Sequence, residues 1–222
     1  MTLAKYIITI DGPAASGKTS VSRRLATHFN WSWVSTGAFY RGLAYIARRE
    51  GIPLEDESAL AKLCLADFWA VKMSDENTLV FLRGENVTAE IYKEENGSAA
   101  SVISRFPKVR ENLLELQRKC AKGVTGLVAE GRDCGTVVFP QAHLKIFITA
   151  GSDDRAERRA KEQGKNIEEM RIAQGQRDEQ DSTRKTAPMQ IPKDAHVIDT
   201  THMGLSEVVD ILISLVRKEL EI

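Results

Sequence analysis

A glycine-rich loop that directly follows an apolar, β-branched run is the feature that most constrains this chain. The run is Tyr6-Ile7-Ile8-Thr9-Ile10, and the loop is Gly12-Pro13-Ala14-Ala15-Ser16-Gly17-Lys18-Thr19. The loop has the form G-x-x-x-x-G-K-[ST], in which two glycines allow successive N–H groups to converge on phosphate oxygens. Lys18 adds a mobile positive charge, and the hydroxyl of Thr19 suits Mg²⁺. The pattern predicts a strand, a phosphate-binding loop and a helix whose positive dipole end faces the same anion.

Apolar periodicity extends this unit into an alternating α/β pattern. Apolar residues recur every four positions after the loop, which predicts a helix over 18–28. A short apolar segment at 31–34 and a second helix from 35 to 49 follow, and this alternation predicts a parallel sheet. The other expected elements are a helix over 107–120, strands at 127–129, 144–149 and 197–198, and a final helix near 205–220.

Two regions carry local signals of their own. Within residues 70–91, apolar runs flank the polar segment Ser74-Asp75-Glu76-Asn77, which predicts an inserted β-hairpin with a multi-residue turn. Later in the chain, Ser152 precedes two aspartates and Asn166 precedes Glu169 by three residues. Both have the chemistry of helix N-caps, and the second has the spacing of a capping box.

The composition limits the possible functions. The chain has 222 residues, enough for one α/β domain with a substantial insertion. Its 31 basic and 31 acidic residues cancel, so binding to nucleic acid or to a membrane surface is not expected, and local arginines must recognise any anion. Three distant cysteines favour a reducing compartment without a metal cluster, and we find no signal stretch or spanning apolar run. We expect a cytoplasmic monomer.

Two charged clusters are candidates for ligand binding. Glu130-Gly131-Arg132-Asp133 ends an expected central strand, and ligands of parallel sheets bind beyond the carboxyl ends of the strands. Arg177 and Arg184 lie seven residues apart with Asp181 between them, so they share a helix face if the helix continues that far. Two guanidiniums and a carboxylate suit a phosphate and a ribose diol. Each cluster also fits a simpler interpretation, either an ion pair that orders a turn or a solvated charged helix.

Together, these residues resemble the bacterial-type cytidylate kinases, a family of nucleoside monophosphate kinases with a P-loop. The similarity spans nearly the whole chain. Its matching segments are the phosphate loop, Thr36-Gly37-Ala38-Phe39-Tyr40-Arg41, 84–91, Ser101, Pro107-Lys108-Val109-Arg110, 131–140, 155–159, 177–184 and 194–200. The chain departs from the family's usual pattern at Ser35, Tyr92, Cys134 and Gln180.

The resemblance implies an α/β P-loop kinase fold, with a central parallel sheet flanked by helices. It implies a single nucleoside monophosphate kinase domain over residues 1–222. Within that domain we expect a monophosphate-binding region at 38–105 with a small β-rich insert at about 66–95, and a helical lid at 151–165 that carries arginines.

The resemblance also implies roles for particular residues. Those expected to bind ATP are Gly12, Pro13, Ala14, Ala15, Ser16, Gly17, Lys18, Thr19, Ser20, Arg155 and Arg158, with Mg²⁺ held through ATP at Thr19. Those expected to bind CMP are Thr36, Arg41, Ser101, Arg110, Arg132, Asp133, Arg177, Asp181 and Arg184. Those expected to act in catalysis are Lys18, Arg132, Arg159 and Arg184.

The activity implied is reversible transfer of the γ-phosphoryl group of ATP to CMP, and to dCMP, with these small nucleotides as the partners. The residues alone leave three alternatives open, one of which is a nucleotide-binding module without catalytic activity. The acceptor could be UMP, AMP or a small alcohol, since Asp133 could act as the base that a hydroxyl acceptor needs. The third alternative is a P-loop switch protein, but the chain has neither an Asn-Lys-x-Asp nor an Asp-x-x-Gly pattern.

Overall fold

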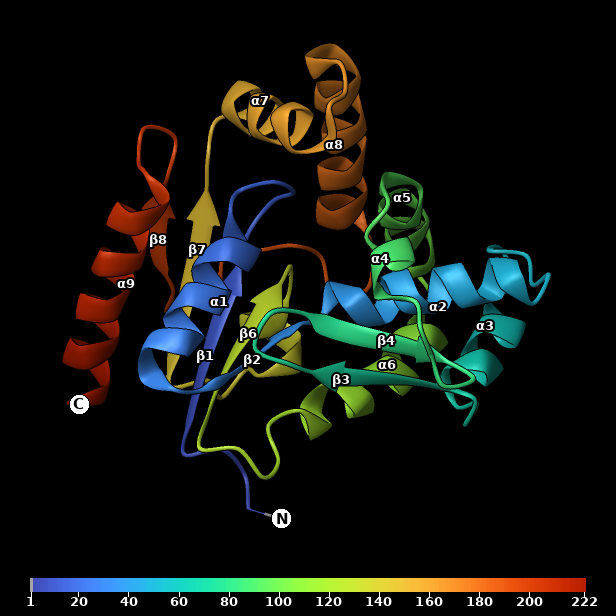
Figure 1. Cartoon of the computed structure of the whole chain (residues 1–222), viewed down its shortest axis with the longest axis horizontal. Helices are drawn as coiled ribbons and strands as arrows, with labels where there is room; N and C mark the ends of the chain where they lie inside the picture. Colours follow the sequence, from blue (N-terminus) through green and yellow to red (C-terminus); the bar gives the residue numbers. More distant parts are fainter. Residues whose placement is uncertain (1) are drawn as a thin grey trace.

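The structure, a computed structural model that describes residues 2–222, is built on a parallel β-sheet. The sheet has five strands in the order β2-β6-β1-β7-β8, and all neighbours are parallel (Figure 1). The strands are β1 (Tyr6–Asp11), β2 (Ser32–Ser35), β6 (Gly126–Gly131), β7 (Leu144–Thr149) and β8 (His196–Asp199). The parallel sheet predicted from the alternating pattern is confirmed.

Helices cover both faces of this sheet. They are α1 (Lys18–Phe29), α2 (Gly37–Arg49), α6 (Pro107–Lys119) and α9 (Leu205–Leu220), close to the expected bounds. Alternate side chains of a strand point to opposite faces. Ile8 and Ile10 of β1 pack in a core with α1 and α9, whereas Ile7 packs in a second core with α2 and α6. Because β1 is buried on both sides, its sequence is a continuous apolar run.

A small antiparallel sheet lies beside the parallel one (Figure 1). It consists of β3 (Trp69–Met73), β4 (Thr78–Leu82) and β5 (Glu85–Asn86). Residues 74–77 connect β3 to β4, so the hairpin expected at 70–91 is confirmed, with β5 and α4 (Thr88–Ile91) as additions. Val80 packs against α2 so closely that its Cγ1 lies 3.1 Å from the position of a Cβ at Gly42.

Two helices of this region, α3 (Glu57–Cys64) and α5 (Glu94–Ile103), were not predicted. The α5 sequence is mostly small and polar, so it lacks the apolar repeat of a surface helix. Its buried positions include Ala99 and Ile103, which join the core shared with α2. Tertiary packing therefore stabilises this helix rather than a strong local signal.

Helix α7 (Ser152–Gln163) lies above the carboxyl end of β7, and α8 (Ile167–Thr183) stands next to it, where it also contacts α5 (Figure 1). Asn166 caps α8 by accepting from the N–H groups of Glu168 and Glu169, as predicted. The N-cap predicted at Ser152 is wrong, because Gly151 occupies that position and Ser152 is already helical. Helix α8 also ends before Arg184, whose backbone is extended.

Candidate functional site

The phosphate loop joins β1 to α1 at the carboxyl edge of the sheet. Gly12 has a φ of 147°, and a Cβ at this position would lie 1.9 Å from the carbonyl oxygen of Ile148, so only glycine fits. Gly17 has a φ of 87° and is the N-cap of α1. The N–H groups of the first turn of α1 consequently face the space above the loop, where they can bind an anion.

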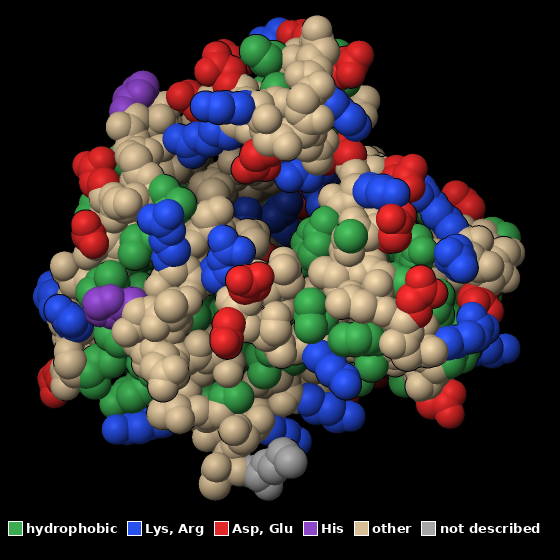
Figure 2. Space-filling model, in the orientation of Figure 1, with side chains coloured by type: hydrophobic (Ala, Val, Ile, Leu, Met, Phe, Trp, Pro, Cys, Tyr) green, Lys and Arg blue, Asp and Glu red, His purple; other side chains and the backbone are tan. Residues whose placement is uncertain are grey.

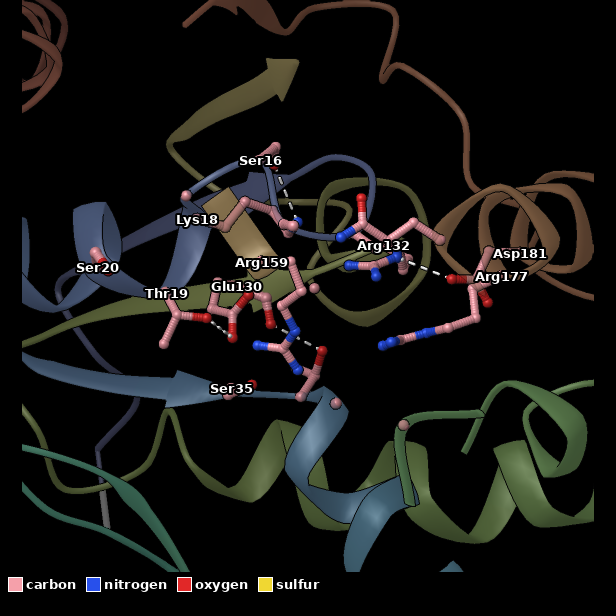
Figure 3. A pocket seen from close by; sticks show the side chains of 18 of the residues that line it. Ser16, Lys18, Thr19, Ser20, Ser35, Glu130, Arg132, Arg159, Arg177 and Asp181 are labelled. Atoms are coloured by element: carbon pink, nitrogen blue, oxygen red, sulfur yellow. Dashed lines mark hydrogen bonds and ion pairs between the residues drawn. The ribbon is translucent and has the colours of Figure 1, made fainter. Parts of the chain in front are cut away.

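The ammonium group of Lys18 is held by the loop itself. It donates to the carbonyl oxygen of Pro13 and to Ser16 Oγ at 3.2 Å, and the residue is 5% exposed (Figure 3). Burial, together with the positive charge of Arg132, lowers the pKa of Lys18 to about 7. A bound anion would offset both effects, so this group favours a negatively charged ligand.

A carboxylate of the first charged cluster, to which the sequence assigned no role of its own, lies next to the loop. Glu130, near the end of β6, is 5% exposed, and its Oε1 accepts a hydrogen bond from Thr19 Oγ1 at 3.2 Å (Figure 3). A hydroxyl and a carboxylate are the oxygen donors that Mg²⁺ prefers. The Thr19 and Glu130 side chains therefore fit a magnesium ion that is bound together with nucleotide phosphates.

Asp11 anchors the turn that follows β6. Its carboxylate accepts hydrogen bonds from the N–H groups of Cys134 at 2.8 Å and Gly135 at 2.7 Å, in the π-helical turn η1 (Cys134–Val138). Burial raises the pKa of Asp11 to about 6, and these two N–H groups oppose that increase. Asp11 thereby fixes the position of the preceding Gly-Arg-Asp segment relative to the phosphate loop.

The two charged clusters predicted from the sequence meet in the structure. Arg132 Nε donates to Asp181 Oδ2 at 2.9 Å (Figure 3), and Asp133 forms a buried ion pair with Arg110. Arg184 lies between the clusters, with its guanidinium 3.4 Å from Asp133 Oδ1 and 3.8 Å from Asp181 Oδ1. The sequence analysis placed Arg184 beside Arg177 only if the helix continued to residue 184. Helix α8 ends at Thr183, but the extended backbone at Arg184 still places its guanidinium between the two clusters.

Arginines of α7 and α8 approach from the opposite side. Arg159 and Arg177 both pair with Glu94 at the start of α5. Arg155 donates to the carbonyl oxygen of Ala14 at 2.9 Å. Arg158 donates to the carbonyl oxygen of Thr200 at 2.7 Å.

Asp178 ties α8 to the phosphate loop. It accepts a hydrogen bond from the N–H of Ala14 at 2.9 Å and pairs with Arg155. On the other wall, Arg41 donates to the carbonyl oxygen of Ile91 at 3.3 Å and lies over the ring of Tyr92, 5.8 Å from its centroid. A single space is thus enclosed by the phosphate loop, α2, α7 and α8.

That space is a cavity of about 520 Å³, within the usual range for a small-molecule site. Lys and Arg side chains are visible in the depth of the hollow (Figure 2). The predicted site residues that line it are Ala14, Ala15, Ser16, Gly17, Lys18, Thr19, Ser20, Thr36, Arg41, Ser101, Arg132, Asp133, Arg158, Arg159, Arg177, Asp181 and Arg184. The others support it from behind: Gly12 and Pro13 shape the loop, Arg110 pairs with Asp133 and Arg155 with Asp178.

Sequence reasoning missed three carboxylates of the site, Asp11, Glu94 and Asp178, and it assigned no role to Glu130 within its cluster. Asp11 and Glu130 each end a strand beside a selected motif, and that position was a usable signal. Asp178 follows a selected arginine, but only the tertiary structure reveals its contact with the loop. Glu94 lies in a helix without a recognisable pattern, so nothing in the local sequence indicated it.

The parallel sheet, the phosphate loop and the arginine-lined cavity define a P-loop kinase. Among solved structures, a gluconokinase from Sinorhizobium meliloti has a similar fold, with a TM-score of 0.51 and 14% identity over 99% of this chain and 97% of that chain. An uncharacterized protein from Eubacterium ventriosum gives a TM-score of 0.55 and 14% identity over 96% of this chain and 98% of that one. At this level of identity the likeness concerns the fold alone.

Sequence comparisons define the family more closely. The model of the Cytidylate kinase family matches residues 8–218. A cytidylate kinase from Bdellovibrio bacteriovorus is 56% identical over 214 residues, which is 96% of this chain and 99% of the relative. One from Geobacillus sp. is 39% identical over 218 residues, 96% of this chain and 97% of the relative. The chain belongs to the cytidylate kinase family. Between residues 2 and 222, no helix has the length and apolarity needed to cross a membrane.

Proposed function

We propose that this protein transfers the γ-phosphoryl group of ATP to CMP and dCMP, giving CDP or dCDP and ADP. The observation that carries the proposal is the continuity of the cavity, which runs from the phosphate loop to the arginines and carboxylates around Arg132 and Asp181. Two anion-binding walls that face one space suit two nucleotides placed end to end. Membership of the cytidylate kinase family supports CMP as the acceptor.

On the donor side, ATP would lie along the phosphate loop. The N–H groups at the start of α1 and the ammonium of Lys18 would bind its β- and γ-phosphates, and Ser20 lies one residue further along the same cavity wall. Arg155 and Arg158 would approach from α7. Mg²⁺ would be held at Thr19 and Glu130, where it supplies positive charge to the donor phosphates.

On the acceptor side, CMP would lie against the turn after β6 and α5. Thr36, Ser101, Arg110 and Asp133 would face the cytosine and its surroundings, and Arg41, Arg110 and Arg132 would bind the acceptor phosphate. Arg177 and Asp181 would hold the ribose. The amino group of cytosine donates where uracil accepts, so a carboxylate such as Asp133 favours cytosine.

The chemistry requires positioning and charge neutralisation. The acceptor oxygen belongs to a phosphate that is largely ionised near neutral pH, so no general base is needed to create the nucleophile. Lys18, Arg132, Arg159 and Arg184 would stabilise the charge on the transferring group during in-line displacement. We assign residues 38–105 to acceptor binding, with the β-rich insert at about 66–95, and residues 151–165 to a lid.

We further propose that the protein acts in the cytoplasm as a monomer whose partners are small nucleotides rather than nucleic acid or a membrane. The balance of 31 basic and 31 acidic residues supports the last of these points, the absence of nucleic acid and membrane partners, because it gives no net field to attract a polyanion.

The decisive experiment is a panel of acceptors with ATP and Mg²⁺, in which products are identified by chromatography. We expect kcat/KM to be highest for CMP and dCMP, lower for UMP and lowest for AMP. A small alcohol should not be phosphorylated. A higher kcat/KM for UMP or AMP than for CMP would contradict the proposal.

A further inference from the structure

Glu94 is a carboxylate that contacts side chains from two other helices. Its Oε2 accepts from Nε and from a terminal nitrogen of Arg159, at 3.3 and 2.8 Å, and from Gln163 Nε2 at 3.1 Å. Its Oε1 accepts from Arg177. These partners lie 65 to 83 residues away in sequence, on α7 and α8, whereas Glu94 begins α5. One side chain therefore joins the acceptor side of the cavity to the proposed lid.

Glu94 acts from behind the cavity wall. The arginines that it holds, Arg159 and Arg177, line the cavity, but Glu94 does not. Its side chain is only 12% exposed, and burial alone would raise its pKa. The charges of Arg177 and Arg159 and the hydrogen bond from Gln163 outweigh burial and lower the pKa to about 2. The carboxylate is thus ionised throughout the pH range of ordinary assays.

A third guanidinium, that of Arg41, lies close to Arg177, one of the two that Glu94 holds. Arg41 and Arg177 both reach over Gly97, where a Cβ would lie 2.8 and 3.0 Å from their terminal nitrogens. Burial, followed by the charges of Arg177 and Arg159, lowers the pKa of Arg41 to about 10, and Glu94 opposes the shift.

We propose that Glu94 is a positioning residue, a carboxylate clasp that orders Arg159 and Arg177 across the cavity and couples closure of α7 to the acceptor side. The proposal rests on the proposed function, because Arg159 and Arg177 are assigned there to the reacting phosphate and the ribose. Arg159 and Arg177 point into the same cavity from different elements (Figure 3). Without a counterion between them, these two like charges repel each other, and the lid loses its tie to α5.

The first test is the Glu94→Gln variant, which keeps the size of the side chain and removes its charge. We expect kcat with CMP to fall about tenfold or more and the KM for CMP to rise, since displaced positioning groups cost one to two orders of magnitude. The KM for ATP should change less than the KM for CMP, because Glu94 does not touch the phosphate loop. Glu95→Gln is the matched control, since the neighbouring Glu95 side chain is 66% exposed and only 4.0 Å from Arg48 as its nearest ion-pair partner.

The second test needs no activity. Spin labels at the exposed positions Ser98 and Glu157, introduced as Ser98→Cys and Glu157→Cys with Cys120→Ser, report the distance between α5 and α7 in the nucleotide-free protein. Glu94→Gln should broaden this distance distribution, and Glu95→Gln should leave it unchanged. If the glutamine variant does not fold, Glu94→Asp keeps the charge but shortens the reach, and it should give a smaller change in the same direction.

The outcomes separate the two proposals. If the wild-type protein phosphorylates no nucleoside monophosphate, the proposed function fails, whereas the label distances still test the clasp. If the wild type phosphorylates CMP and Glu94→Gln has a kcat within twofold of it, the positioning role of Glu94 is overturned, whatever the labels report. An unchanged distance distribution in Glu94→Gln also overturns it.

Discussion

The arginines of the cavity are held by carboxylates in the same cavity wall. Arg132 pairs with Asp181, Arg110 with Asp133, and Arg184 lies close to both carboxylates. Such pairs fix guanidiniums that would otherwise sample many rotamers, so less entropy is lost when a nucleotide binds. The carboxylates also offset the mutual repulsion of the guanidiniums while no ligand is bound. A substitution at one of these residues can therefore remove a contact with the ligand, an ion pair within the protein, or both.

Arg184→Ala should reduce kcat on the order of 10³-fold with CMP, because an arginine that reaches the transferring phosphoryl group makes its strongest contact in the transition state. Steady-state kinetics measures this. Arg171→Ala is the control, since Arg171 is on α8 but its side chain is 49% exposed and pairs with Glu168 and Asp153 outside the cavity. If Arg184→Ala turned over CMP at the wild-type rate, the role assigned to Arg184 would be wrong.

Asp133→Asn should narrow the preference for CMP over UMP by about tenfold, because an amide can donate to the oxygen that uracil presents in place of the cytosine amine. The measurement is the ratio of kcat/KM for the two acceptors. This ratio does not depend on the active fraction of enzyme, so any loss of folded protein from weakening the buried pair with Arg110 cancels. An unchanged ratio would remove Asp133 from base recognition.

Lys18 should take up a proton when ATP binds above neutral pH. With a pKa of about 7 in the free protein, about nine-tenths of Lys18 is neutral at pH 8, and the phosphates of ATP raise that pKa again. The affinity for ATP should therefore decrease as pH rises above about 7. Calorimetry in buffers of different ionisation enthalpy measures the uptake, and Lys18→Arg, which stays charged, should lack it. Proton release at pH 8 would contradict this assignment.

At the scale of single residues, the sequence was informative where several constrained residues stand together. The phosphate loop and the Arg177 to Arg184 cluster are such runs, and both line the cavity. The carboxylates that orient them could not be predicted equally well. Glu94 is 83 residues from Arg177, and no local spacing relates them, because the fold alone brings α5 against α8.

At the scale of elements, replacing a glycine by alanine should have opposite effects on stability at two positions, one in the phosphate loop and one in the middle of α8. Gly12→Ala places a Cβ 1.9 Å from a backbone oxygen of β7 and also requires a positive φ. We expect it to destabilise the fold by about 2–5 kcal/mol and to abolish nucleotide binding. Gly175→Ala, in the middle of α8, meets nothing within 4 Å and should stabilise by about 0.5–1 kcal/mol.

Urea unfolding of both variants measures the difference, and an isotherm for ATP measures binding. Equal stability of Gly12→Ala and the wild type would mean that the loop can move away from β7. Lower stability of Gly175→Ala than of the wild type would mean that a methyl group at this position of α8 is not accommodated without strain.

Element boundaries followed from the sequence wherever burial and periodicity coincide, as in β1, α1 and α9. They were missed where packing decides. Helix α5 has small and polar residues that suit close approach to α2 and α8, but these residues carry no helical repeat. The N-cap at Gly151 was also missed, because a cap without a side-chain hydrogen bond leaves no chemical signature.

At the scale of the whole molecule, the fold brings face to face two groups of residues that we propose bind the two ligands. The loop, Thr19 and Glu130 come from the sheet and α1, whereas Arg159 and Arg177 come from the helices above the sheet. The α/β class and the inserted hairpin could be predicted, because local alternation specifies them. The position of α7 and α8 above the sheet could not be predicted, because it depends on long-range contacts such as the hydrogen bonds of Arg155 and Asp178 with the backbone of Ala14 in the phosphate loop.

This separation gives the last prediction. With ATP but without an acceptor, the lid arginines have no acceptor nucleotide to close on, and water is not held in line with the γ-phosphate. ATP hydrolysis should therefore be at least about 100-fold slower than phosphorylation of CMP. A coupled assay of ADP with and without CMP measures both rates, and Lys18→Ala gives the background of any contaminating ATPase. Hydrolysis as fast as transfer would mean that water enters the reacting position freely, and the assignment of residues 151–165 as a lid would then be untenable.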